Sequence, residues 1–305
     1  MNIAITKQKP VQPAVLLTTA EILKKVKELE IKSKKITQHL FTGEYHSAFK
    51  GRGMSFREVR EYYPGDDVRF IDWNVSARFS TPFTKLFEEE RELTVMLLVD
   101  VSASSLFGTV HARKKDLVTE IGAVLTFSAI SNNDKVGVIF FSDKVEKYIP
   151  PKKGKQHALY IVRELLTAEP KRKGTNLGDA LRFFSNSTRQ KSISFVLSDF
   201  LDDSFTDSLK VAGKKHDIIG IKVYDKMDVQ LPDAGLLQVS DSETGKTQWV
   251  DSSDYWVRQQ YEKRFFEHTE WCKTLFLKSG SDLLHVRTDE DYVKILQKFF
   301  VGRHK

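Results

Sequence analysis

The sequence of 305 residues contains a single cysteine, Cys272. One thiol excludes an internal disulfide framework and a cysteine-rich zinc site, and it fits a reducing compartment, so we expect a cytoplasmic protein. There is also no run of eighteen consecutive apolar residues, and the first ten residues lack the apolar core of a signal peptide. The composition therefore predicts neither a transmembrane segment nor secretion.

Two nucleotide-binding motifs are missing as well. No G-x-G-x-x-G follows the first strong strand pattern, and no G-x-x-x-x-G-K-[ST] occurs anywhere, so dinucleotide and P-loop sites lack support. The net charge of +7 comes from lysines spread over several helical stretches rather than from one basic tract. No nucleic-acid partner is therefore expected, whereas an acidic protein or peripheral contact with an anionic membrane surface is compatible with the charge.

The most apolar stretch, residues 93–105, reads L-T-V-M-L-L-V-D-V-S-A-S-S. Five apolar residues in succession without polar alternation indicate a strand buried on both faces, as in the centre of a parallel sheet. The carboxyl end of this strand carries Asp100, Ser102 and Ser104. In open α/β sheets, ligands bind at that edge.

Strand and helix patterns alternate after this stretch. Strands are predicted at 134–141, 145–149, 192–197, 218–223 and 283–286, a hairpin at 236–239 with 247–250, and helices near 111–130, 156–167, 177–189, 205–214, 254–277 and 289–300. Such alternation implies right-handed βαβ units. The expected fold class is therefore α/β, a Rossmann-like domain with a central, mostly parallel sheet flanked by helices.

Three regions are predicted along the chain: a leader and helix at 1–42, a small β-rich subdomain at 43–90, and the α/β domain at 91–303. Residues 1–17 are expected to be a loosely attached leader, followed by a helix from Ala20. The subdomain contains a Pro64-Gly65-Asp66 turn between segments rich in arginine, aspartate and aromatic residues.

Ion pairs between arginine and aspartate are expected to lock the loops of this subdomain. Its structural residues are Arg57, Arg60, Tyr62, Gly65, Asp66, Arg69, Asp72, Trp73 and Arg78, and Asp67 is a further partner for the ion pairs. A catalytic arginine–aspartate constellation is the alternative, but no histidine, cysteine or lysine nucleophile stands among them.

Oxygen-bearing side chains occur in three loops at the ends of strands or the starts of helices. They are Asp100, Ser102 and Ser104 after the first buried strand, Thr175 in a glycine-bounded turn, and Asp199 directly after another buried strand. Carboxylates and hydroxyls are suitable ligands for a hard divalent cation. The alternative for Asp100 and the serines is capping of the next helix, where these residue types are favoured.

This D-x-S-x-S pattern with a distal Thr and a distal Asp resembles the metal-ion-dependent adhesion site (MIDAS) of von Willebrand factor A (VWA) domains. The resemblance implies that Ser102, Ser104 and Thr175 bind the cation directly and that Asp100 and Asp199 act directly or through water. The expected ion is Mg²⁺, or Mn²⁺ or Ca²⁺. Because only two of the five side chains are anionic, the ion would keep an exchangeable position for a partner carboxylate.

A second resemblance rests on G-R-G-M-S-F-R-E-V-R-E-Y-Y-P-G-D-D-V-R-F-I-D-W-N-V-S-A-R at 51–78 and on the closing segment 281–303. Both are similar to the bacterial "domain of unknown function 58" family, in which such a block precedes a VWA-like domain. Members typically occur with MoxR-type AAA+ ATPases and are thought to be adaptors or chaperone partners. The resemblance implies a metal-dependent protein-interaction module without catalytic activity. Many members carry membrane helices ahead of the block.

Two alternative functions remain open. A metal-dependent phosphatase of the D-x-D type would need an acid at position 102, which is Ser102, and His111, His157 and His216 lie apart in sequence. Nucleic-acid binding through the basic amino-terminal helix and the loop Lys171, Arg172 and Lys173 would weaken steeply with salt. We interpret this loop instead as a positively charged rim that favours an acidic protein partner, since it closely precedes Thr175.

Overall fold

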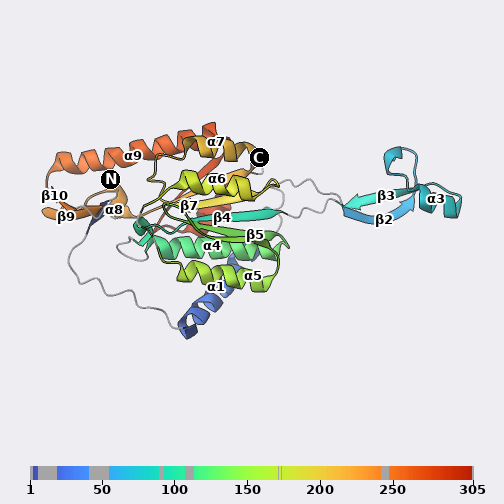
Figure 1. Cartoon of the computed structure of the whole chain (residues 1–305), viewed down its shortest axis with the longest axis horizontal. Coiled ribbons are helices and arrows are strands. Elements are labelled where there is room, and N and C mark those ends of the chain that lie inside the picture. Colours follow the sequence, from blue (N-terminus) through green and yellow to red (C-terminus); the bar gives the residue numbers. More distant parts are fainter. Residues whose placement is uncertain are drawn as a thin grey trace.

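The structure, a computed structural model, describes residues 3–5, 19–40, 55–88, 93–106, 113–170, 172, 174–241 and 247–303. A six-stranded sheet forms its centre, in the order β11-β8-β7-β4-β5-β6 (Figure 1). The strands are β4 (Thr94–Asp100), β5 (Lys135–Phe141), β6 (Val145–Lys152), β7 (Ile193–Ser198), β8 (Asp217–Tyr224) and β11 (Asp282–Arg287). All neighbours are parallel except β5 and β6, which are antiparallel. The mostly parallel sheet predicted from the sequence is confirmed.

The order of these strands shows at which point the sheet changes the direction in which successive strands are added. In chain order, the sheet first grows from β4 through β5 to β6, and then continues on the other side of β4 with β7, β8 and β11. The direction of growth therefore reverses between β4 and β7. In doubly wound sheets, the carboxyl ends of the strands at this switch point form the ligand crevice.

Helices cover both faces of the sheet (Figure 1). They are α4 (Lys114–Ser131), α5 (Lys155–Thr167), α6 (Leu177–Ser187), α7 (Thr206–Lys215), α9 (Tyr255–Lys278) and α10 (Tyr292–Gly302). Alternate residues of β4 enter two apolar clusters: Val95, Leu97 and Val99 face α4 and α10, whereas Met96 and Leu98 face α6, α7 and α9. Burial on both faces is the physical reason for the uninterrupted apolar run of this strand.

One glycine of the sheet is required by close packing. A Cβ atom at Gly220 of β8 would lie 2.6 Å from Cε1 of Phe276 in α9. Only hydrogen fits there, so α9 can approach the sheet closely.

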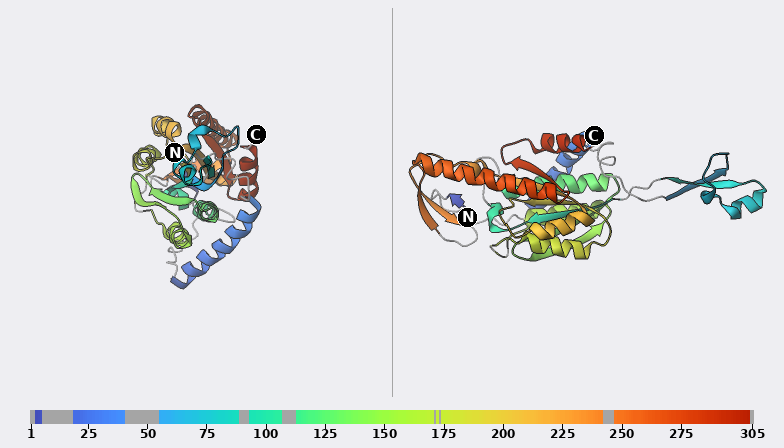
Figure 2. Two further views of the ribbon diagram at one scale, coloured as in Figure 1. Left: turned by 90° about the vertical axis from the view of Figure 1, so that its right-hand side faces the viewer. Right: turned by 90° about the horizontal axis from the view of Figure 1, so that it is seen from above.

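The amino-terminal helix α1 (Thr19–Leu40) contacts α4, α5 and α10. Its buried Val26 joins an apolar cluster with Phe127 and Ala158. Seen end-on in Figure 2, α1 crosses the outside of the domain diagonally. None of the helices in the described part of the chain is both long and apolar enough to cross a membrane.

A second, three-stranded sheet has the order β1-β9-β10. The hairpin of β9 (Leu236–Asp241) and β10 (Thr247–Asp251) was predicted, whereas β1 (Ile3–Ile5) lies in the segment expected to be a loosely attached leader. β1 instead pairs antiparallel with β9, from Ile3 opposite Asp241 to Ile5 opposite Val239. The short helix α8 (Lys226–Val229) comes before β9 in the chain.

Residues 55–88 form a small unit, here called the arm, which Figures 1 and 2 show apart from the α/β domain. It contains the antiparallel pair β2 (Ser55–Glu61) and β3 (Phe83–Glu88), the 3₁₀ helix η1 (Val68–Phe70) and the helix α3 (Trp73–Phe79). The predicted turn is confirmed: Gly65 has φ +111°, and the Asp66 amide donates to the Tyr63 carbonyl at 3.0 Å. The helix α3 was not predicted.

Ion pairs stabilise the arm in part as expected. Arg60 Nη2 lies 2.8 Å from Asp66 Oδ1, and Arg69 Nη2 lies 2.6 Å from Asp67 Oδ2. Asp72 pairs with Lys85 rather than with an arginine, and its carboxylate caps α3 by accepting from two backbone amides. Trp73 and Arg78 are exposed, and the side chain of Arg57 lies outside the described residues.

Candidate metal centre at the carboxyl edge of the sheet

Asp100 ends β4 and is only 4% exposed. Its Oδ1 accepts a hydrogen bond from the Ser102 amide at 2.9 Å, and its Oδ2 accepts one from the Ser198 hydroxyl at 2.7 Å. Ser198 is the last residue of β7, so this carboxylate joins the ends of the two strands at the switch point. Asp100 does not cap α4, whose N-cap residue is Arg113.

The two predicted serine ligands, Ser102 and Ser104, come shortly after Asp100 in the chain. The chain turns after Asp100 into a 3₁₀ helix, Ala103–Leu106, which places the hydroxyl oxygens of Ser102 and Ser104 3.0 Å apart. Both side chains are buried. The neighbouring Ser105 hydroxyl donates to the Ser102 carbonyl at 2.7 Å and thereby holds the turn.

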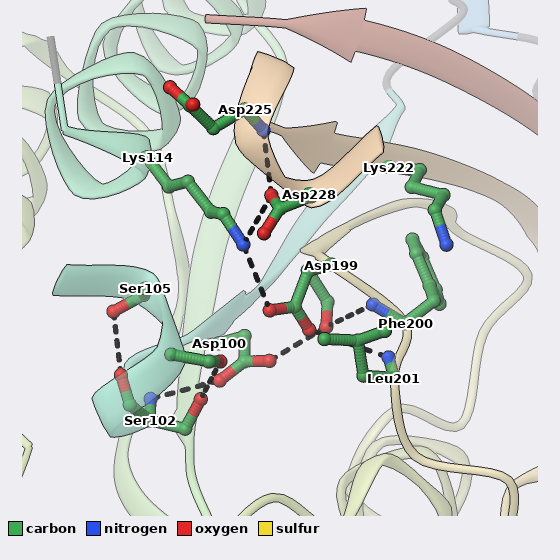
Figure 3. A network of polar contacts seen from close by, with 12 residues as sticks. Asp100, Ser102, Ser105, Lys114, Asp199, Phe200, Leu201, Lys222, Asp225 and Asp228 are labelled. Carbon is green, nitrogen blue, oxygen red and sulfur yellow. Dashed lines mark hydrogen bonds and ion pairs between the residues drawn. The ribbon is translucent and has the colours of Figure 1, made fainter. Parts of the chain in front are cut away.

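Asp199 follows β7 and is 7% exposed. The next residue, Phe200, has φ +54°, a left-handed conformation that costs a non-glycine residue about 1 kcal/mol. This turn packs the Phe200 ring against Phe276, with 5.3 Å between ring centroids. Figure 3 shows the Asp199 carboxylate beside Asp100, as the sequence predicted. The buried aromatic contact thus offsets the strain of a turn that orients Asp199.

Lys114, the first residue of α4, enters the same site and was not predicted (Figure 3). Its side chain is 4% exposed, and its Nζ lies 2.8 Å from Asp228 Oδ2 and 3.5 Å from Asp199 Oδ2. Burial lowers the pKa of Lys114, but Asp228 and Asp199 more than offset this effect, so that its pKa lies above the usual value. Lys114 is therefore a charged ammonium inside the site.

Negative charge is nevertheless in excess around Asp100. Burial, and then repulsion by Asp199, raises the pKa of Asp100 to about 7, even though hydrogen bonds from Ser102 and Ser198 act in the opposite direction. Asp100, Asp199 and Asp228 thus stand against Lys114 in a largely dehydrated place, together with the buried Lys222, whose own pKa burial lowers. A small cavity opens here and is lined by residues that include Asp100, Ser104, Lys114 and Asp199.

The donor set fits a divalent cation on physical grounds. Two buried carboxylates that repel one another would be stabilised by positive charge, and two hydroxyl oxygens lie beside them. Among the described residues, no group of three or more His, Cys, Asp or Glu side chains is arranged to hold a metal. Any cation at this edge would therefore depend on hydroxyl oxygens as well as carboxylates.

Thr175 is the fifth predicted ligand, and the structure brings it to the same edge but not into the cavity lining. It lies in the loop before α6, where the Asn176 amide donates to the Ser142 carbonyl at 2.7 Å after β5. The Leu177 amide donates to Asp202 Oδ2 at 2.9 Å, which ties this loop to the one after Asp199. Four of the five predicted ligands thus lie together, with Thr175 in an adjacent loop.

The predicted basic rim is described only at Arg172, which is exposed and lies 3.2 Å from Asp143 Oδ2. Lys171 and Lys173 fall outside the described residues, as does His111. His157 bonds the Val136 carbonyl at 2.9 Å, and His216 is buried beside the Ser192 hydroxyl at 3.0 Å. Neither of these histidines is positioned as a general base for the site.

A larger cavity of about 300 Å³ lies elsewhere, between α1 and α4. Its lining includes Lys25, Glu28, Lys32, Asp116 and Glu120, with Lys32 paired to Glu120. Because the two signs of charge are mixed there and no residue is shared with the Asp100 site, it is a separate surface feature.

Comparisons with known proteins extend over both the arm and the α/β domain. The family described as "Protein of unknown function DUF58" matches residues 58–271. "Uncharacterized protein Rv1480" of Mycobacterium tuberculosis (strain ATCC 25618 / H37Rv) is 29% identical over 283 residues, which cover 92% of this chain and 89% of that protein. "Uncharacterized protein YeaD" of Bacillus subtilis (strain 168) is 32% identical over 110 residues, which cover 36% of this chain and 25% of that protein.

Solved structures were compared as well. The crystal structure of the conserved hypothetical protein BatB from Bacteroides thetaiotaomicron superposes with a TM-score of 0.47 and 16% sequence identity. The superposition covers 70% of this chain and 98% of that one.

Proposed function

The chain belongs to the DUF58 family, and from this membership and the site at Asp100 we propose that it is a metal-dependent protein-interaction module. Asp100, Ser102, Ser104 and Asp199, with Thr175 from the adjacent loop, would hold Mg²⁺, or Mn²⁺ or Ca²⁺. When bound, the cation would offer an open coordination position to an aspartate or glutamate carboxylate of a partner protein.

One observation carries this proposal: Asp100 and Asp199 are two buried neighbouring carboxylates, and the hydroxyl oxygens of Ser102 and Ser104 lie beside Asp100. Burial, and then repulsion by Asp199, raises the pKa of Asp100 to about 7. A fold gains nothing from such repulsion, because burying like charges without compensation is unfavourable. A divalent cation would convert the repulsion into binding energy. The neutral hydroxyls would leave part of its charge for a partner carboxylate.

The partner that fits the family resemblance is a MoxR-type AAA+ ATPase, for which this protein would be an adaptor or chaperone partner. An acidic surface on that partner would meet the exposed Arg172, which lies in the loop before Thr175. We propose binding rather than catalysis because position 102 is Ser102 and because neither His157 nor His216 is placed to transfer a proton at the site.

The test is binding of the full chain to a purified MoxR-type ATPase, measured by biolayer interferometry with Mg²⁺ and with EDTA. Ser102→Ala should abolish binding as EDTA does, because it removes a ligand oxygen. Ser187→Ala is the matched control, since its hydroxyl donates to the Phe184 carbonyl within α6 and lies outside the cavity lining, so this variant should keep binding. An affinity for the ATPase that is unchanged both by EDTA and by Ser102→Ala would contradict the proposal.

Hydrolysis can be tested separately. Purified protein should not turn over generic phosphate esters in the presence of Mg²⁺ or Mn²⁺. Turnover that disappears in Asp199→Ala would replace the binding proposal with a metal-dependent hydrolase.

A further inference from the structure

We propose that Lys114 sets the cation affinity of the Asp100 site, by competing with the cation for Asp199 while Asp228 draws the ammonium away. This inference rests on the proposed function, because it assumes that the site binds a divalent cation. It assigns Lys114 and Asp228 as positioning residues rather than as ligands.

The ammonium of Lys114 lies where a cation and a lysine would compete. Its Nζ is 3.5 Å from Asp199 Oδ2, and its side chain lines the same small cavity as Asp100 and Ser104. Lys114 begins α4, whose buried face includes Leu117 and Ile121, so its backbone is fixed against the sheet. The ammonium therefore lies within reach of both the Asp199 and the Asp228 carboxylate.

Asp228 is the nearer of the two carboxylates, at 2.8 Å from Lys114 Nζ. The same Oδ2 accepts a hydrogen bond from the Asp225 amide at 2.7 Å. Asp225 is held in turn by the Thr288 hydroxyl, which donates to its Oδ2 at 2.8 Å, and Thr288 directly follows β11. Asp228 is therefore a fixed anchor, and it holds the Lys114 ammonium closer to itself than to Asp199.

The two charges have opposite effects on a cation at Asp199. Removing the positive charge of Lys114 frees the Asp199 carboxylate and takes away repulsion, so cation binding should strengthen. Removing the negative charge of Asp228 leaves the ammonium to Asp199, so cation binding should weaken. Damage to the fold would weaken binding in both variants, which makes the opposite signs diagnostic.

The experiment measures Mg²⁺ and Mn²⁺ affinity of the full chain by isothermal titration calorimetry. Lys114→Met should bind at least about tenfold more tightly than the wild type, and Asp228→Asn about tenfold more weakly, each corresponding to about 1.4 kcal/mol. The double variant Lys114→Met/Asp228→Asn removes both partners of this ion pair at once, and it should also bind more tightly than the wild type. Thermal unfolding without metal verifies that each variant is folded.

Lys115→Met is the matched control. It makes the same charge change one residue along α4, but its Nζ donates to the Ala168 carbonyl instead of facing the site. Its cation affinity should equal that of the wild type.

Two outcomes overturn the inference for different reasons. If the wild type binds Mg²⁺ or Mn²⁺ but Lys114→Met and the folded double variant bind no more tightly, Lys114 does not compete and the proposed function stands. If neither the wild type nor any variant binds a cation, the proposed function fails together with the inference.

Discussion

Replacing Asp100 with asparagine should stabilise the metal-free protein at alkaline pH, although it removes two hydrogen bonds to a charged acceptor. Asp100 is 4% exposed, and its pKa is raised from the ordinary 3.8 to about 7, first by burial and then by Asp199. Between these two values the folded protein keeps a proton that the unfolded chain has lost. The free energy of unfolding therefore falls as the pH rises from about 4 to about 7.

The magnitude follows from the same values. A pKa raised from 3.8 to about 7 corresponds to about 4 kcal/mol at pH 8, all of which Asp100→Asn should recover. Weaker hydrogen bonding of the amide to Ser102 and Ser198 should offset about 1–2 kcal/mol of this gain. A net stabilisation of about 2–3 kcal/mol remains at pH 8. At pH 5 the two effects nearly cancel, because only about 2 kcal/mol of the penalty is present there.

Urea denaturation of the wild type and of Asp100→Asn at pH 8 and pH 5, each with EDTA or with Mg²⁺, provides the measurement. The wild type should gain stability from Mg²⁺ at pH 8, whereas Asp100→Asn should not respond because a ligand carboxylate is gone. The reasoning would be refuted if Asp100→Asn were destabilised equally at both pH values. An equal response of both proteins to Mg²⁺ would refute the assignment of Asp100 as a ligand.

Three further predictions concern the core. Burial and then the charge of Lys215 lower the pKa of His216 from 6.5 to about 4, so stability should fall by up to about 3 kcal/mol as the pH drops from 6.5 to 4, and His216→Gln should flatten this dependence in urea titrations. Burial raises the pKa of Cys272 to about 11, so mass spectrometry should find alkylation at pH 8 only when the chain unfolds; rapid labelling of the folded protein would contradict this burial. Gly220→Ala should cost about 1–3 kcal/mol by forcing a methyl group against Phe276, while Gly302→Ala, with open space around it, should not destabilise the protein in the same thermal assay.

The sheet and the position of the site could be predicted because their determinants are local in sequence. Continuous apolar runs identified β4, β5 and β7, and alternation with helices implied parallel neighbours. The carboxyl ends of such strands meet at one edge, which brought Asp100 and Asp199 together without any knowledge of the strand order. The Ser198 hydroxyl bound to Asp100 is the contact that joins them.

Lys114 could not be predicted because its burial depends on contacts distant in sequence. A lysine in the first turn of a helix normally lies in solvent, and only the placement of β8 beside β7 brings α8 and its Asp228 over this lysine.

Two secondary-structure elements were also missed. The three residues of β1 are too few for a periodic pattern. The helix α3 did carry a local indication, since Asp72 precedes it as an N-cap, but its seven residues were predicted only as part of a β-rich subdomain.

The position of β4 in the chain has a mechanical consequence. The arm ends at Glu88, ahead of this strand in the chain, and the seven residues of β4 then span about 20 Å to Asp100. β4 is hydrogen-bonded along its length to parallel strands on both sides. A pull along the strand would load these bonds in shear, so that they would resist together instead of opening one after another. Tension that reaches the first residue of β4 would thus pass to Asp100 through a stiff element.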